Sequence, residues 1–529
     1  MTDQIMSPLA SPVARSIHTT SDARDRLKKR YRSEANFKAM GVAALSVAIV
    51  FLVVLLSSIA WKGVPAFVYN FASLPMNTSA VDRTNLAAAN YDALVKQSVR
   101  DQFPELTSRA DTKILNSLMS SGAPILLRDR VVADPTVLDR PGAASLPISD
   151  FADLYLKGQI AASAWTELEG AATVEMSGEE VAIALSGEAF APALAALPPA
   201  ADATVPRVLN SGDPSLLLYA GNTVIKLKSL AAGSATGTVI VGAIATPGPS
   251  IDKPRLRTVL VPEASRKFSD KEMVFTDMLV ERGFITTGFN WIFATRGASR
   301  EAEMAGILGA VLGSALTLVV TLALAFPVGV AAAMYLEEFA PRNRWTTFIE
   351  VNINNLAAVP SIVFGLLGLA VFLNFFGFER SAPYVGGFVL ALMTLPTIII
   401  ASRVALRSVP PSIREGALGI GASKLQMVID HVLPLAMPGV LTGAIIGMAR
   451  ALGETAPLLM IGMVAFVVDL PTTFASPATV LPVQIYMWAD FPEPAFEQRT
   501  SAGILVLLVF LILMNLTAIL LRRRFERRW

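Results

Sequence analysis

Residues 410–438 read PPSIREGALGIGASKLQMVIDHVLPLAMP, a polar and basic segment between two long hydrophobic runs. Two serine residues in it are each followed three positions later by a glutamate or a glutamine, as Ser412 is by Glu415 and Ser423 by Gln426. Both pairs match the capping box, in which the two side chains satisfy free backbone N–H groups at the start of a helix. The segment therefore predicts two helix starts.

Two glycines and a proline define the rest of this segment. Gly419 and Gly421 lie between the boxes and can adopt the left-handed backbone that ends one helix before the next begins. The second helix carries four apolar residues at the spacing i, i+3, i+4 and i+7, which predicts one apolar face. These residues are Leu425, Val428, Ile429 and Val432. Pro434 is predicted to stop this helix or to bend it into the following hydrophobic run.

The composition indicates a membrane protein with a soluble part. Of the 529 residues, 53% are hydrophobic and only 16% are charged, and the mean hydropathy is +0.54. This is too apolar for an ordinary soluble protein, but it is too charged for membrane spans alone. The net charge of +2 gives no argument for nucleic-acid binding. The chain has no cysteine, and its two histidines, His18 and His431, lie far apart, so we expect no metal or catalytic cluster.

Six hydrophobic runs are long enough to cross a hydrocarbon core of about 30 Å. They occupy residues 39–60, 306–334, 348–376, 384–401, 438–468 and 502–521. The first run could instead be a cleaved signal peptide, but it is too long for one and follows a long basic tail. The predicted parts are a cytoplasmic basic tail at 1–38, a first transmembrane helix at 39–61, an α+β insertion at 62–302, and a membrane core at 303–529 that contains the loop 410–435.

The distribution of lysine and arginine predicts the orientation in the membrane. Four segments on one side carry most of these residues: the tail 1–38, the loops 337–344 and 403–435, and the C-terminal RRRFERR. The short loops on the other side carry only Arg380 and Arg499. By the positive-inside rule, both termini and the loop 410–435 are cytoplasmic, and the insertion is extracytoplasmic.

The insertion shows mixed secondary-structure signals. Residues 216–227 contain two β-rich runs around an Ala-Gly-Asn turn, and residues 237–244 are a further strand candidate. Helices are predicted at 87–100 and 149–156, with Ser149 as a cap. Its acidic residues have the spacing of a solvated surface, and no enzyme site is indicated.

Charged residues inside the hydrophobic runs are the candidates for chemistry. Arg450 and Glu454 lie four residues apart in the fifth run, where an ionised group costs from about 2.5 to more than 10 kcal/mol unless it is paired or faces water. They are predicted to share a helix face. Arg450 then offers a forked cation to a passing oxyanion while Glu454 holds it, or the two form a structural ion pair. Arg403 and Arg407 either line an anion exit or extend their charges to the membrane surface.

The segment 410–438 resembles the coupling loop of ABC importer permeases. The positions in register with the family pattern are Glu415, Ala417, Gly421, Leu433 and Pro434, whereas Gly416 replaces an alanine and His431 replaces an isoleucine. In that family the loop inserts into a cleft on a separate ATPase subunit. The resemblance implies that Ser412 and Ser423 cap the helices of an ATPase-coupling site. The chain has no G-x-x-x-x-G-K-[ST] motif with which to hold ATP itself.

Three stretches narrow the resemblance to the PstA family of phosphate-importer permeases. They are NNLAAVPSIVFGLLGLAVF at 354–372, LPTIIIASRVALRSVPPSIREGALGIGAS at 395–423 and RALGETAPLL at 450–459. The fourth span of that family is similar to LP-x-x-x-R-x-x-E, whereas Ile400 and Arg403 occupy the last two positions here. The large insertion is a second departure.

The resemblance implies an α-helical polytopic membrane protein with the six-helix type I ABC importer fold and an inserted α+β soluble extracytoplasmic domain. The implied function is import of inorganic phosphate across the bacterial inner membrane by alternating access. The implied partners are a second permease (PstC-like), two ATPase subunits (PstB-like) that hold ATP and Mg, and a periplasmic phosphate-binding protein (PstS-like). This chain itself would bind no cofactor. Alternatives are a permease for sulfate, molybdate or phosphonate, and a membrane sensor that uses its extracytoplasmic domain.

Overall fold

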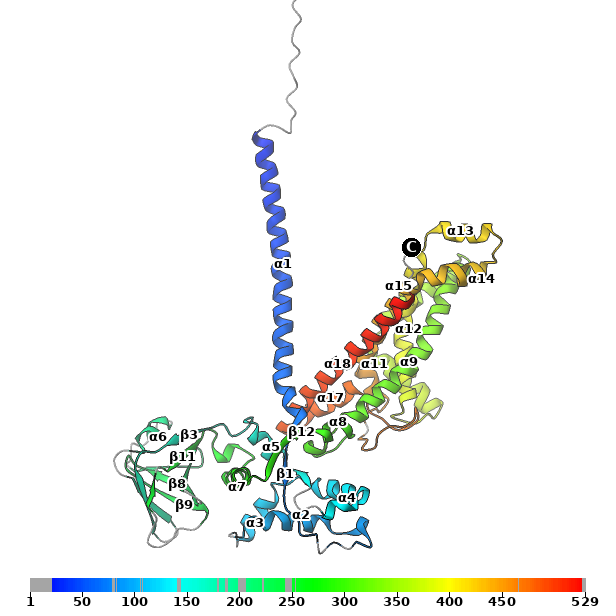
Figure 1. Ribbon diagram of the computed structural model, residues 1–529. Helices are drawn as coiled ribbons and strands as arrows, with labels where there is room; N and C mark the ends of the chain where they lie inside the picture. The colour runs from blue at the N-terminus through cyan, green and yellow to red at the C-terminus, as the bar shows by residue number, and fades with distance from the viewer. Residues whose placement is uncertain are drawn as a thin grey trace, which may run out of the picture. The chain divides into compact units, whose positions relative to one another are not determined.

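The computed structural model describes most of the chain. The described residues are 21–78, 81, 83–104, 106, 108–139, 144–177, 180–185, 189–197, 206–220, 223–242, 250–252, 254–464 and 466–525. His18 and the last residues of the basic C-terminal tail lie outside them. Two compact units divide at residue 61. The first unit is dominated by helix α1 (Ser21–Gly63), drawn in blue in Figure 1, so the first predicted span is helical.

A short three-stranded sheet forms the base of the insertion. The strand β1 (Val68–Ser73) pairs antiparallel with β12 (Ile285–Phe289) on one side and with β2 (Ser145–Pro147) on the other. The pairing of β1 with β12 brings the two ends of the insertion together. Asn70 of β1 is also anchored by its side chain, because its Nδ2 donates to Asp153 Oδ1 at 2.9 Å.

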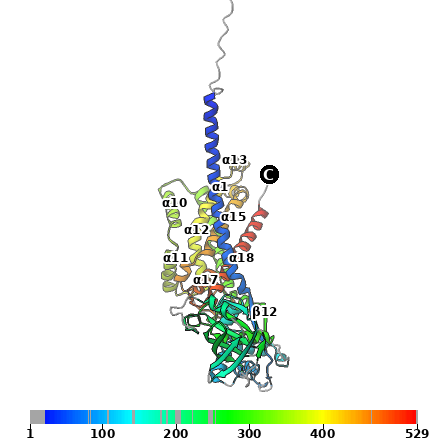
Figure 2. The same ribbon diagram turned by 90° about the vertical axis from the view of Figure 1, so that its left-hand side faces the viewer.

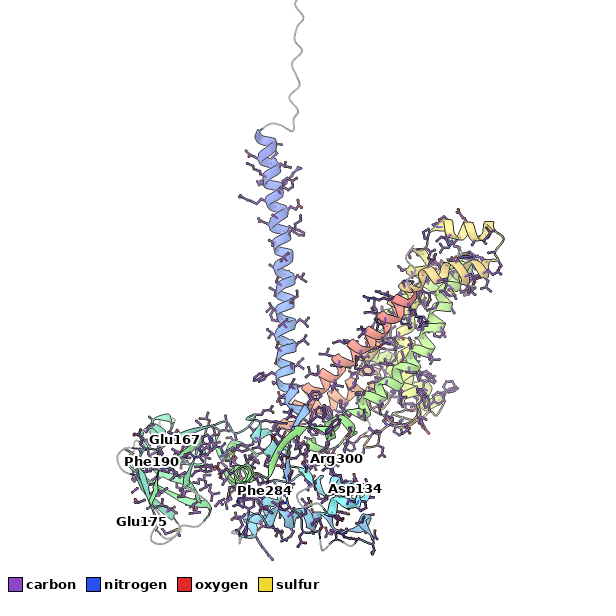
Figure 3. All side chains as sticks on the ribbon, viewed as in Figure 1. Asp134, Glu167, Glu175, Phe190, Phe284 and Arg300 are labelled. Atoms are coloured by element: carbon purple, nitrogen blue, oxygen red, sulfur yellow. The ribbon has the colours of Figure 1, made fainter. Side chains whose placement is uncertain are left out.

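A larger sheet of nine strands forms one part of the insertion. Its order is β10-β4-β5-β9-β8-β7-β11-β3, with β6 beside β8. The bounds are β3 (Ser163–Glu167), β4 (Ala171–Ser177), β5 (Glu180–Leu185), β6 (Arg207–Val208), β7 (Ser215–Ala220), β8 (Thr223–Leu230), β9 (Ser234–Val241), β10 (Ser250–Asp252) and β11 (Arg255–Val259). β7 and β8 form the predicted hairpin, and β9 is the further predicted strand. Phe190, labelled in Figure 3, is fully buried in the core of this sheet.

Helices form the rest of the insertion. They are α2 (Tyr91–Arg100), α3 (Arg109–Asn116), α4 (Ala123–Ala133), α5 (Asp150–Leu156), α6 (Ala191–Ala196), α7 (Asp270–Glu281) and α8 (Trp291–Thr295). Ser149 caps α5 as predicted, because its Oγ accepts the backbone N–H of Ala152 at 3.4 Å. The helix predicted from residue 87 begins at Tyr91, where Asn90 provides the cap instead.

Four long helices run side by side in the membrane core (Figure 1). They are α9 (Leu308–Met334), α12 (Pro383–Arg407), α15 (Leu433–Gly453) and α18 (Pro494–Phe525). Small residues let α12 and α15 approach closely, since a Cβ atom on Gly443 would lie 2.3 Å from the Cβ of Ala401, and one on Gly439 would lie 2.6 Å from that of Ala405. The described residues contain five helices that are long and apolar enough to span a membrane.

The predicted span at 348–376 is not one straight helix. The chain forms α10 (Arg344–Ala357) and α11 (Ser361–Gly368), which meet at an angle of 100°. Pro360 causes the break, because it has no N–H group for a continuing helix and disfavours helical backbone in the residue before it. Figure 2 shows α10 and α11 at one edge of the bundle. The described residues contain six candidate spans, α1 and five in the membrane core, if this bent pair crosses the membrane once.

The predicted span at 438–468 is also wrong in its second half. Helix α15 ends at Gly453, a short helix α16 (Ala456–Met460) follows, and the chain then turns toward α17 (Leu481–Asp490). Pro457 explains the ending, because it cannot donate the hydrogen bond that the Gly453 carbonyl would need in a continuous helix. The Arg450 and Glu454 pair therefore lies at the end of a helix.

Candidate transport path and coupling segment

The first of the two predicted capping boxes is absent. Helix α13 (Pro411–Gly419) begins after Pro410 and has no side-chain cap, so Ser412 already lies within its first turn. Pro411 accounts for the early start, since its fixed φ angle suits the first helical position. The prediction that Ser412 caps this helix with Glu415 is wrong.

The second capping box is present. Ser423 Oγ accepts the backbone N–H of Gln426 at 3.2 Å, and Gln426 Oε1 accepts the backbone N–H of Ser423 at 2.9 Å. Gly421 makes the turn that precedes it, with a φ angle of +92°. Gly419, by contrast, is the last residue of helix α13 and needs no left-handed backbone. The glycine turn is therefore confirmed at one of the two predicted positions.

The apolar face predicted for the second helix is split between two directions. After α14 (Lys424–Gln426) the chain makes a π-helical turn, η10 (Met427–Val432), that leads into α15 without a stop at Pro434. Val428 and Val432 are fully buried, whereas Leu425 and Ile429 are exposed. A π turn adds a residue to each turn, so the spacing of an α-helix no longer places the four side chains on one face.

We use the name hairpin for residues 411–432. Four apolar side chains of the hairpin are exposed to between 46% and 82%: Leu418, Ile420, Leu425 and Ile429. Glu415 is exposed as well, while Ala417 is buried and Leu433 is partly buried against the same cluster. Of the predicted coupling residues, Glu415 is therefore placed for contact with a partner, and Ala417 and Leu433 support the hairpin from inside.

A partly buried arginine that no sequence signal singles out holds the hairpin to the helices. Arg414 donates to Glu338 Oε1 from both Nη2 (2.7 Å) and Nε (3.1 Å), and its remaining donors meet the carbonyl oxygens of Leu406 (2.9 Å) and Val409 (2.7 Å). Glu338 lies in the π-helical turn η8 (Tyr335–Phe339) after α9, and its side chain is only 7% exposed. One guanidinium thus joins α9, the end of α12 and α13.

Replacing Arg414 with alanine should destabilise the chain by about 2–3 kcal/mol, because it leaves the Glu338 carboxylate buried without its partner. The matched control is Arg407→Ala, since the Arg407 side chain is 61% exposed and its ion pair with Glu337 should contribute less than about 1 kcal/mol. Denaturant unfolding of the purified chain measures both. Equal losses of stability in the two variants would contradict the role of Arg414.

Arg403 also has carboxylate partners. Its Nη2 donates to Glu350 Oε1 at 2.6 Å, and its Nε donates to Glu337 Oε2 at 3.4 Å. Glu350 belongs to α10, so this arginine joins the bent helix pair to α12. The predicted role of Arg403 in a substrate path stays a prediction. An anion that binds Arg403 would have to compete with the Glu337 and Glu350 carboxylates.

Arg450 and Glu454 do form an ion pair, with Arg450 Nε 3.5 Å from Glu454 Oε1. Glu454 lies just beyond the last residue of α15 in extended backbone, so the prediction that both share a helix face is wrong. The Arg450 side chain is 46% exposed, compared with 19% for Glu454. The guanidinium can therefore reach an anion on its open side while the carboxylate holds its other side.

A buried arginine at the start of α18 joins the core to the end of the insertion. Arg499 is 2% exposed, donates from Nη1 to the carbonyl oxygen of Ala305 at 3.2 Å, and lies 5.2 Å above the ring of Phe293. Glu303, two residues before Ala305, is also buried. Burial raises the pKa of its carboxyl to about 7, and Asp150 adds to the rise. The junction thus contains a carboxyl group that titrates near neutral pH.

Glu303 should make stability depend on pH. Its folded pKa of about 7 exceeds its ordinary value of 4.5, so its carboxyl is neutral in both states below pH 4.5 and imposes a cost on folding that grows as the pH rises to about 7. The full cost is on the order of 3 kcal/mol. Glu303→Gln should therefore match the wild type in melting temperature at pH 4 and exceed it at pH 8. A difference that is the same at both pH values would contradict this assignment.

Comparisons with known proteins match both parts of the chain. Residues 325–529 match the family described as "Binding-protein-dependent transport system inner membrane component", and residues 24–165 match a "Domain of unknown function (DUF3333)". "Phosphate transport system permease protein PstA 1" of Mycobacterium tuberculosis is 32% identical over 255 residues, which are 47% of this chain and 82% of that protein. "Probable ABC transporter permease protein YqgI" of Bacillus subtilis is 31% identical over 239 residues, which are 43% of this chain and 81% of that protein.

Among solved structures, the MetNI methionine ABC transporter in an inward-facing conformation matches 41% of this chain and 95% of its own, at 18% identity and a TM-score of 0.34. That similarity is too low to transfer structural detail. The sequence relatives are sufficient to assign the class, which is that of ABC importer permeases with a sheet-containing insertion. The chain belongs to the PstA-like family of binding-protein-dependent transport permeases.

Proposed function

We propose that this chain is the membrane permease subunit of an ATP-driven importer that moves inorganic phosphate into the cytoplasm by alternating access. Relatives that are 32% identical over 255 and 243 aligned residues, which are 82% and 78% of their own length, are phosphate transport system permeases. The observation that carries the coupling part of the proposal is the hairpin, which exposes four apolar side chains and the Glu415 carboxylate. An exposed apolar surface with a polar rim is typical of a protein docking site.

The proposed partners complete the transporter. ATPase subunits would hold ATP and Mg and receive the hairpin, a homologous second permease would complete the membrane path, and an extracytoplasmic binding protein would deliver phosphate. The excess of lysine and arginine around residues 337–344 and 403–435 supports a cytoplasmic hairpin, and it supports an extracytoplasmic insertion. Arg450 is the proposed contact for the anion, because its planar fork matches an oxyanion.

Competition for uptake tests the proposed substrate. Cells that carry the complete transporter should take up labelled phosphate, and a large excess of sulfate, molybdate or a phosphonate should leave the rate unchanged. A matched strain without this chain gives the background rate. Strong inhibition by one of these other oxyanions would overturn the assignment to phosphate and identify that oxyanion as the substrate.

A further inference from the structure

The insertion contains an open cleft with a volume of about 1170 Å³. Its walls come from α2, α3, the starts of α5 and α7, and the segment 301–303. The volume slightly exceeds the range of about 300–1,000 Å³ that is usual for pockets that bind small organic molecules. Neither the coupling hairpin nor the proposed anion path includes any residue of this cleft.

Four cationic side chains line the cleft without an ion-pair partner in the part of the chain that the structure describes. They are Arg100, Arg109, Lys113 and Lys267. Another lysine of the cleft, Lys96, is instead neutralised by Asp92 at 2.7 Å. Arg109 and Lys113 lie four residues apart on α3 and repel each other, so an anion bound beside them lowers the electrostatic energy.

The cleft also contains hydrogen-bond acceptors, which an anion without donor groups cannot satisfy. Asn116 Oδ1 is buried and has no hydrogen-bond partner among the described residues. Burial raises the pKa of Glu303, and the Asp150 and Glu301 carboxylates, which also line the cleft, add to the rise. These carboxyl groups are therefore near each other. Glu303 already has a hydrogen bond with Ser120, and Asp150 Oδ1 accepts the backbone N–H of Phe151 at 2.8 Å, so Asn116 Oδ1 is the acceptor that still needs a donor.

We propose that the cleft binds a small organic anion that has a phosphate or carboxylate group at one end and hydroxyl or amino donors at the other. The four unpaired cations receive the anionic group, and the donors meet Asn116 and the acidic group of side chains. Orthophosphate by itself occupies a small part of the cleft and leaves Asn116 Oδ1 without a partner. The insertion is thereby a ligand-binding domain attached to a permease.

Titration calorimetry on the purified full chain in detergent tests this proposal with four probes: glucose 6-phosphate, phosphoethanolamine, gluconate and orthophosphate. At least one of the three organic anions should bind about tenfold more tightly than orthophosphate. A preference for the two phosphorylated probes identifies a phosphate as the anionic group, and a preference for gluconate identifies a carboxylate. No binding by any organic probe at about 10 mM, or equal affinity for orthophosphate, overturns the proposal.

Variants separate the contribution of the cations from that of Asn116. Arg109→Gln combined with Lys113→Gln should weaken binding of the organic anion about tenfold or more, whereas Asn116→Ala should weaken it about fivefold and leave orthophosphate unaffected. Arg342→Gln combined with Arg344→Gln, on the loop before α10 and at the first residue of that helix, is the matched control and should change nothing. Unaltered melting temperatures show that the variants fold. Binding that survives the double variant in the cleft overturns the assignment of the cations, whatever the outcome of the transport assays.

Discussion

Replacing Ile420 with aspartate should reduce co-purification of the ATPase partner at least 30-fold while the chain itself stays folded. Ile420 is 82% exposed at the tip of the hairpin, so its loss should change the stability of the isolated chain by less than about 0.5 kcal/mol. In a complex, a central apolar side chain contributes about 2 kcal/mol or more, and a buried aspartate adds a desolvation cost. The reduction in pull-down yield from detergent-solubilised membranes measures the effect.

The matched control for this experiment is Val208→Asp. Val208 is 61% exposed in the insertion, far along the chain from the hairpin, so the same exchange of an exposed apolar residue for aspartate should leave the complex intact. Glu415→Ala should weaken the complex less than Ile420→Asp does, because an exposed charge at an interface rim contributes little. Normal recovery of the ATPase with the Ile420→Asp variant would show that the hairpin is not the docking site.

Replacing Arg450 with alanine should lower phosphate uptake at least 100-fold with normal assembly of the transporter. The loss corresponds to about 3 kcal/mol, which is the size expected when a charge-assisted contact to an anion is removed. Arg450→Lys should recover only part of the rate, because an ammonium group lacks the planar fork. Glu454→Gln should reduce uptake less, since it removes the group that holds the arginine but keeps the cation.

Initial rates of labelled phosphate uptake, measured at equal amounts of assembled transporter, decide this prediction. Arg342→Ala, at an exposed arginine before α10, is the control and should leave the rate within about twofold of the wild type. If Arg450→Ala and Glu454→Gln both transport at that rate, the pair is structural and the path lies elsewhere.

Local signals in the sequence predicted local structure well. The caps at Ser149 and Ser423 and the pairing of β7 with β8 each depend on residues close together in the chain, and all are found in the structure. Ser412 failed because the neighbouring Pro411 already occupies the first turn of the helix. A competing signal one residue away is enough to move a helix start.

Prolines and π turns explain the errors within the membrane core. Pro360 bends a run that is apolar enough for one span. Pro457 cannot donate a hydrogen bond to the Gly453 carbonyl, so the helix that carries Arg450 ends before Glu454. The hydrophobicity of such a run predicts its length but not where it bends. The π turn η10 likewise changes the direction of Leu425 and Ile429, although their spacing is that of an α-helix.

The contacts of Arg414 could not be predicted from a single sequence. Glu338 lies 76 positions away, and only the packing of α9 against α12 brings the two side chains together. In the sequence, residues 337–344 have the pattern of a polar loop, and their charges indicate only which side of the membrane they face. The same applies to Arg403, whose carboxylate partners come from two other segments of the core.

The most direct measurement of the central claim is phosphate accumulation in proteoliposomes that contain the assembled transporter, with its binding protein on one side of the membrane and ATP on the other. We predict that labelled phosphate accumulates against its gradient only when both ATP and the binding protein are present. Transporter carrying Ile420→Asp should show no accumulation. Accumulation that needs no ATP, or ATP-driven accumulation of another oxyanion in place of phosphate, would contradict the claim.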